Sequence, residues 1–250
     1  WRGNNLYCIE TMRTKILISF LFFSISIFES EAQLFTKERL LNNENFDKAP
    51  LSYGYYLGFN SYDFNIDYKT NVKDIQVLKA VGFNVGLIGN VRINDYFDIR
   101  LEAGLVMTNR TLSYSNTHCD CNTSRQNNLE REIRSTYIHI PLLIKISTKR
   151  INNIKPFIVG GISTALNLSS NQDNPDDNSN GNFRMIKNNV FYELGIGIDF
   201  YLTWFKFTPS LRGVFSLNDE HVPDFDANSP WTSNIDQMQT RGLFINFTFQ

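Results

Sequence analysis

Beyond Pro50 the chain alternates between apolar and polar side chains at every second position, which is the period of a β-strand with one apolar face. In residues 97–108, Phe97 and Ile99 share one face while Asp98 and Arg100 share the other. Helical spacing of apolar residues is nearly absent from this part of the chain. The alternation predicts eight strands, at residues 53–68, 81–92, 97–108, 133–146, 156–168, 190–202, 205–217 and 241–250.

The first of these segments changes phase. Its apolar residues fall on odd positions up to Phe59 and on even positions from Tyr62 onwards. One extra residue in a strand would produce such a shift, so the pattern predicts a β-bulge near Asn60 and Ser61.

The connections between the predicted strands alternate in length. Three are short, at Asn94-Asp95, at residues 147–155 and at Thr203-Trp204. Four are long and polar, at residues 69–80, 113–131, 169–189 and 218–239. This interleaving predicts an all-β, eight-stranded antiparallel up-and-down barrel with its four long loops on one side and its three short turns on the other.

The polar faces of the strands carry balanced charge. A soluble ligand-binding barrel would turn its apolar face inward, whereas an outer-membrane barrel turns apolar residues to lipid and encloses the polar ones. Buried charges need partners, so the mixture of signs favours a transmembrane barrel with a structural charge network in its lumen. We call the following residues the lumen network: Asp98, Arg100, Glu102, His139, Lys145, Glu193, Asp199, Lys206 and Arg212.

Aromatic residues gather where the strands meet the short turns, as expected for an interfacial girdle. The predicted girdle comprises Tyr53, Tyr55, Tyr96, Phe97, Phe157, Phe200, Tyr201, Trp204, Phe205, Phe247 and Phe249.

The N-terminal region has the pattern of a secretory signal peptide. Arg13 and Lys15 follow Met12, an apolar stretch runs over 16–28, and Ala32 ends a small-residue cleavage site. The predicted organisation is an upstream extension plus cleaved signal peptide at 1–32, a periplasmic segment at 33–52 and the barrel at 53–250. Export through the Sec pathway to the cell outer membrane follows from this assignment.

Composition narrows the function classes. With 24 Lys+Arg against 25 Asp+Glu there is no basic excess for nucleic acid. Three cysteines cannot form a disulfide framework, and removal of 1–32 leaves only Cys119 and Cys121. No run of about 20 apolar residues suggests a membrane helix. The aromatic share of 14%, with 21 Phe and 11 Tyr, suits a lipid-facing surface.

Candidate chemical sites are few. The His118-Cys119-Asp120-Cys121 cluster could bind a soft metal and loop 169–189 could bind calcium, but a polar loop is the default for both. His139 shares a face with Glu193 and Asp199, which permits a hydrolase interpretation, although a structural role in the lumen is favoured. Trp231, on a polar loop, could contact a partner or pack over the barrel mouth. We therefore expect no catalytic, cofactor or metal site.

With strands and loops placed, the chain resembles the PorT family of Bacteroidota outer-membrane barrels. Its resemblance lies mainly in two loop stretches, with further similarity in strands that the broader barrel group shares. The resemblance implies a part in type IX protein secretion and gliding motility, with outer-membrane lipid and other secretion proteins as partners, and it carries over no catalytic residues. Two alternatives stay open: an adhesive barrel that binds through its surface loops, and a lipid-modifying enzyme that uses His139. The stretches that carry the resemblance are residues 53–64, 135–143, 155–161, 165–178 and 228–236.

Overall fold

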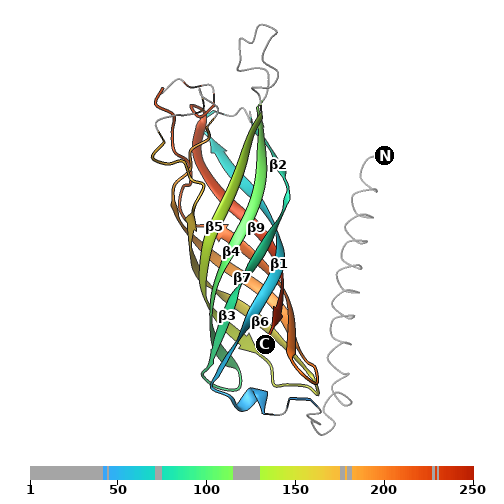
Figure 1. The fold of residues 1–250 in the computed structure, drawn as a ribbon. Coiled ribbons are helices and arrows are strands. Elements are labelled where there is room, and N and C mark those ends of the chain that lie inside the picture. Colours follow the sequence, from blue (N-terminus) through green and yellow to red (C-terminus); the bar gives the residue numbers. More distant parts are fainter. Residues whose placement is uncertain are drawn as a thin grey trace, which may run out of the picture. The chain divides into compact units, whose positions relative to one another are not determined.

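The computed structural model describes residues 42–43, 45–70, 75–114, 130–174, 178, 182–226, 229 and 231–250. Apart from a short 3-10 helix, η2, its regular elements are strands (Figure 1). No helix among these residues is both long and apolar enough to cross a membrane. The elements are η2 (Phe46–Lys48), β1 (Leu51–Tyr68), β2 (Ile75–Lys79), β3 (Val81–Arg92), β4 (Phe97–Tyr114), β5 (Glu130–Ser147), β6 (Ile154–Asn167), β7 (Asn188–Tyr201), β8 (Lys206–Ser216) and β9 (Ile235–Phe249).

All strand pairs are antiparallel, and pairing of β4 with β5 closes the sheet into a ring. Strands β2 and β3 lie end to end along β4. Lys79 pairs with Arg110, and Phe83 pairs with Met107. The interval from 79 to 83 is therefore one residue longer than the interval from 107 to 110 on β4, which defines a β-bulge between β2 and β3. The ring therefore has eight members, and the predicted antiparallel barrel is confirmed.

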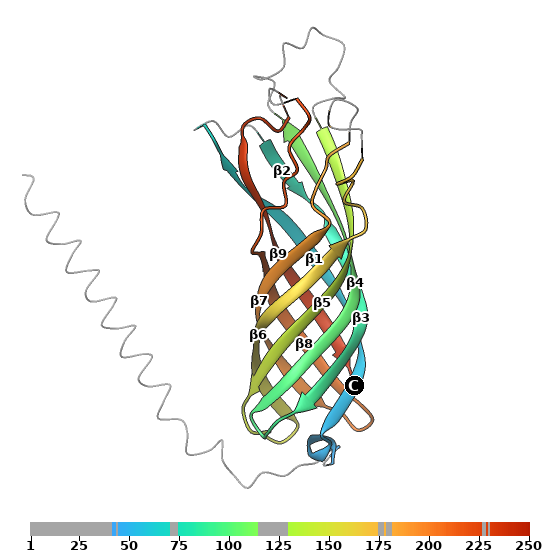
Figure 2. The ribbon, with the colours of Figure 1, turned by 90° about the vertical axis from the view of Figure 1, so that its left-hand side faces the viewer.

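The strands are strongly tilted, as both ribbon views show (Figures 1 and 2). A path along paired residues that leaves β1 at Tyr53 returns to β1 at Asp63, ten residues farther on. In an eight-stranded barrel such a stagger gives a tilt of roughly 35–45° and an interior that side chains can fill. The path runs through Tyr53, Gly89, Leu101, Leu142, Ile162, Tyr192, Phe215, Arg241 and Asp63.

The predicted bulge at Asn60 and Ser61 is wrong. Both neighbours of β1 keep their register through these residues, and the one shift lies at Asp67 and Tyr68. Even positions point inward along most of β1, so the phase of the strand never changes. What changes is the environment: the outward side chains are polar from Ser61 onward, and the inward ones are aromatic or apolar from Tyr62 onward.

Five strands continue beyond this level at the long-loop end, where β6, β7 and β8 stop (Figures 1 and 2). We call these extensions the wall; they are β1 from 62, β2, β4 from 108, β5 up to 136 and β9 up to 242. The predicted loops 69–80, 113–131 and 218–239 are therefore shorter than expected, because strand residues occupy part of each. The sequence pattern did not reveal the inner face of the wall, because apolar side chains point inward there and outward in the rest of the barrel.

An apolar cluster fills the inner side of the wall. Connections from the shorter side of the barrel supply Phe183 and Met185, and Trp231 packs against the cluster. The mouth is thus packed by the chain itself. The wall contributes Phe64, Leu112, Tyr114, Ile133, Ile235 and Met238.

Candidate functional site

Ionisable side chains gather in the lumen, because inward positions on several strands hold them. Eight members of the lumen network are buried there, whereas Asp98 is half-buried at the short-turn end. The sources are β4 (Asp98, Arg100, Glu102), β5 (His139, Lys145), β7 (Glu193, Asp199) and β8 (Lys206, Arg212).

Five of these residues form a continuous chain of charged contacts. The Arg212 guanidinium lies 2.8 Å from Glu102 and 3.2 Å from Glu193. Arg100 lies 3.9 Å from the other oxygen of Glu102, and His139 Nε2 lies 2.9 Å from Glu193. Each buried carboxylate therefore has a cationic or N–H neighbour, as burial of charge requires.

A second group lies nearer the short turns. Lys145 donates a hydrogen bond to Asp199, which also accepts one from the Thr208 hydroxyl at 2.7 Å. The Lys145 ammonium lies 4.1 Å from the ring centroid of Phe157. Phe157 and Tyr201 were expected in the outer girdle, but both are buried in the lumen. The weak polarity contrast of β6 conceals the true orientation of Phe157.

His139 does not have the geometry of a nucleophilic relay. Ser163 Oγ and Glu193 Oε1 both approach the same nitrogen, Nε2, at 3.0 and 2.9 Å. A Ser-His-acid triad needs the hydroxyl and the carboxylate on opposite ring nitrogens. All three side chains are also sealed inside the barrel, so the arrangement suits a structural role.

Arg110, which the sequence analysis missed, lies above this network. It donates hydrogen bonds to Thr240 and Tyr137, both at 3.0 Å, and its guanidinium lies 3.8 Å from the Phe64 ring centroid. The predicted strand ended at residue 108, although the alternation of Thr108, Arg110 and Leu112 continues through it. Extending the period by two residues would have found it.

Glu220 and His221, on the β8–β9 connection, have shifted pKa values. Burial raises the pKa of Glu220, although Arg110 and hydrogen bonds from Thr240 oppose the shift. Burial also lowers the pKa of the neighbouring His221. Both residues lie beyond the short strands at the long-loop end.

The short-turn mouth is closed by the segment before β1, which the sequence analysis treated only as a periplasmic segment. Asp47 accepts a hydrogen bond from Tyr201 Oη at 2.7 Å and lies 3.6 Å from Arg150. Arg150 also donates to the carbonyls of Asn42 and Asn43. The hollow left between this segment and the lumen is only about 20 Å³, room for about one water.

The loop candidates have different outcomes. The His118–Cys121 cluster lies outside the described residues, as does part of loop 169–189. Within the described ranges no cluster of His, Cys, Asp and Glu could hold a metal. Trp231 packs edge-on against Tyr114, with ring centroids 4.8 Å apart, and lies 4.2 Å from the Arg131 guanidinium. It therefore packs against the chain itself.

A family model for the outer membrane protein beta-barrel domain matches residues 32–222. The chain belongs to this family. No curated protein matches the sequence.

Solved structures of other outer membrane barrels are similar in fold, at low identity. OprG of Pseudomonas aeruginosa is 11% identical, with 80% of this chain and 93% of OprG covered and a TM-score of 0.44. Neisserial surface protein A is also 11% identical, with 80% and 98% covered and a TM-score of 0.38. The N-terminal barrel of Pseudomonas aeruginosa OprF is 12% identical, with 79% and 100% covered and a TM-score of 0.35.

In an outer membrane β-barrel protein the short turns lie on the periplasmic side and the long loops outside the cell. The exposed apolar residues of the strands then face lipid. Tyr53, Trp204 and Phe205 are exposed near the periplasmic turns, where an aromatic girdle belongs. The wall projects outside the cell.

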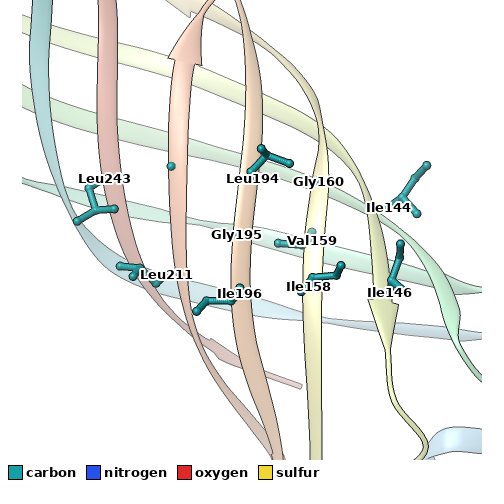
Figure 3. A pocket seen from close by; sticks show the side chains of 11 residues that line it. Ile144, Ile146, Ile158, Val159, Gly160, Leu194, Gly195, Ile196, Leu211 and Leu243 are labelled. Atoms are coloured by element: carbon teal, nitrogen blue, oxygen red, sulfur yellow. The ribbon is translucent and has the colours of Figure 1, made fainter. Parts of the chain in front are cut away.

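The lipid face of this outer membrane protein has a hollow of about 600 Å³ across β5 to β9 (Figure 3). Leu194 is paired with Gly160 on one side and Gly213 on the other. Because glycine has no side chain, the surface is hollow on both sides of Leu194. The lining is almost wholly apolar and suits acyl chains. It includes Ile144, Ile158, Ile196, Leu211 and Leu243.

Proposed function

We propose that this outer membrane barrel supports type IX protein secretion, and with it gliding motility, as an accessory or assembly component. The proposal rests on the similarity of its loop stretches to PorT proteins. The observation that shapes it is the filled lumen, because Arg212 and Glu102 join across an interior already occupied by side chains. A wide protein-conducting pore does not fit such an interior.

Deletion of the gene, followed by comparison of secreted and periplasmic proteins, tests the proposal. Cargo should accumulate in the periplasm and return to the medium when the wild-type gene is restored. Unchanged secretion in the deletion strain would contradict the proposal. Large, stable conductance steps from the purified protein in planar bilayers would contradict the accessory role.

A second candidate is a barrel that binds partners or surfaces through its outer loops. Phe225, on the β8–β9 connection, favours it because the side chain is 69% exposed and lies 4.1 Å from the Arg184 guanidinium. An exposed aromatic beside a cation is a typical contact point. Loss of adhesion with intact secretion in Phe225→Ala would favour this candidate. Loss of secretion in the same variant would instead assign Phe225 to the secretion function.

The third possibility, a lipid-modifying enzyme based on His139, has no favourable geometry. We infer that His139 is structural. An unchanged lipid A profile in His139→Gln would agree, whereas loss of a lipid A modification would contradict it.

A further inference from the structure

The outer surface of the barrel carries a second hollow, at the extracellular edge of the apolar band and beside the bulge between β2 and β3. Its volume is about 510 Å³. One half is apolar and the other half is polar. The apolar half consists of Phe59, Val81, Phe83 and Met107, and the polar half includes Asn109, Arg134 and Thr136.

Strand register explains this division. Phe59, Phe83, Met107 and Thr136 are paired in one row across β1, β3, β4 and β5. The rings of Phe59 and Phe83 meet edge-on, with centroids 6.3 Å apart. The next outward residues toward the long loops are Ser61, Val81, Asn109 and Arg134, and all of them except Val81 are polar. The hollow therefore straddles the boundary between lipid chains and headgroups.

The polar side of the hollow contains one cation, Arg134, and two more cations, Lys79 and Arg241, lie on the surface beside it. Arg134 binds Glu132 at 3.0 Å, and Glu132 also accepts a hydrogen bond from Asn109. On the adjacent surface Asp63 is shared by two cations, Lys79 at 3.0 Å and Arg241 at 2.8 Å.

Three cations thus face two carboxylates at this level, and all three are at least half exposed. On the other side of the barrel, three residues at or just beyond the long-loop ends of β6, β7 and β8 are uncharged. They are Leu168, Asn188 and Leu217. The cluster of three cations therefore lies on one side of the barrel, whereas the other side has Lys187 as a separate exposed cation.

We propose that this hollow binds the phosphorylated glycolipid of the outer leaflet, the lipid A class, with an acyl chain on the Phe59–Phe83 side and a phosphate beside Arg134 and Lys79. An amphiphile with these two chemistries matches both halves of the hollow, since guanidinium and ammonium groups bind phosphate by charge-assisted hydrogen bonds. The amide of Asn109 and the hydroxyl of Thr136 are suited to sugar hydroxyls. Because exposed ion pairs are weak, a phosphate can displace Glu132 from Arg134 at little cost.

Binding of fluorescent lipid A to the folded full chain in detergent micelles tests the proposal. Phosphorylated lipid A should bind about tenfold more tightly than dephosphorylated lipid A or phosphatidylglycerol, the scale of one charge-assisted contact. Millimolar inorganic phosphate should not compete, because it lacks the acyl part. Equal affinity for all three lipids, or full competition by inorganic phosphate, would overturn the proposal.

Variants locate the site. Lys79→Ala combined with Arg134→Ala should weaken binding about tenfold, and Phe83→Ala should also weaken it. Two controls match these changes on the other side of the barrel: Lys187→Ala removes an exposed extracellular cation, and Ile162→Ala shortens a lipid-facing side chain. Both controls should bind as wild type does, and every variant should show the heat-dependent gel shift of a folded barrel. Equal loss of affinity in test and control variants would overturn the assignment.

Discussion

Arg212 of β8 donates a hydrogen bond to Glu102 of β4, the strand directly opposite in the ring, at 2.8 Å. Three strands separate β4 from β8 in either direction. The same guanidinium contacts Glu193, so one cation joins three strands through the centre of the barrel. Side chains, and not only backbone pairing, therefore hold opposite sides of the barrel together.

Loss of Arg212 should be costly. Arg212→Met leaves Glu102 and Glu193 without their shared cation, so the free energy of unfolding should fall by about 3–5 kcal/mol. Urea unfolding in lipid vesicles measures the change. Lys149→Met, in an exposed periplasmic turn, is the control and should have little effect.

The double variant Arg212→Met with Glu102→Gln should be less destabilised than the two single changes predict together, because it removes one of the unpaired carboxylates. Strict additivity would show that the contact contributes no coupling energy.

Tyr56 requires small neighbours. A Cβ atom at Gly86 would lie 2.7 Å from the Tyr56 ring and 2.6 Å from the Ala103 carbonyl. Gly86→Ala should therefore lower the free energy of unfolding by about 1–3 kcal/mol, as overpacking does. Gly89→Ala is a matched control on the same strand, since its nearest contact is 4.0 Å away. Equal stabilities of the two variants would refute the packing argument.

Glu220 should give stability a pH dependence. Its pKa is raised in the folded state, so its favourable contribution is complete below the unfolded value and is lost as pH rises through the folded value. Glu220→Gln should abolish this loss, which thermal unfolding between about pH 4 and 8 would detect. His221, whose pKa is lowered, contributes stability that disappears on acidification, so the comparison should be repeated in His221→Gln. An unchanged pH profile in Glu220→Gln would exclude this source.

The periplasmic closure should depend on Arg150. Arg150→Ala removes donors to Asn42 and Asn43 and the ion pair with Asp47, so residues 42–49 should become sensitive to protease while the barrel stays folded. Lys48→Ala is the control, because the side chain of Lys48 donates a hydrogen bond to Asn45 within its own segment. Equal protection in Arg150→Ala and wild type would show that other contacts hold the segment.

The barrel and its inward-facing charges were predictable because lipid favours apolar residues at the outward positions, which are every second residue of a strand. Partners such as Glu102 and Arg212 were not, since a ten-residue stagger decides which side chains meet across the lumen. The misplaced bulge in β1 has a related cause. Beyond Ser61 the outer face leaves lipid, so the rule that apolar means outward reverses while the strand continues unchanged. Arg110 was missed because the predicted strand ended at residue 108, whereas β4 continues to Tyr114.

The wall also gives the molecule a direction within the plane of the membrane. Because β1, β2, β4, β5 and β9 continue on one side and β6 to β8 end earlier, the extracellular end consists of strands on one side and of chain connections on the other (Figure 2). A protein that recognises this end must approach it in a defined orientation about the barrel axis. Neighbours in a crowded membrane would then be arranged around the barrel by orientation as well as by affinity.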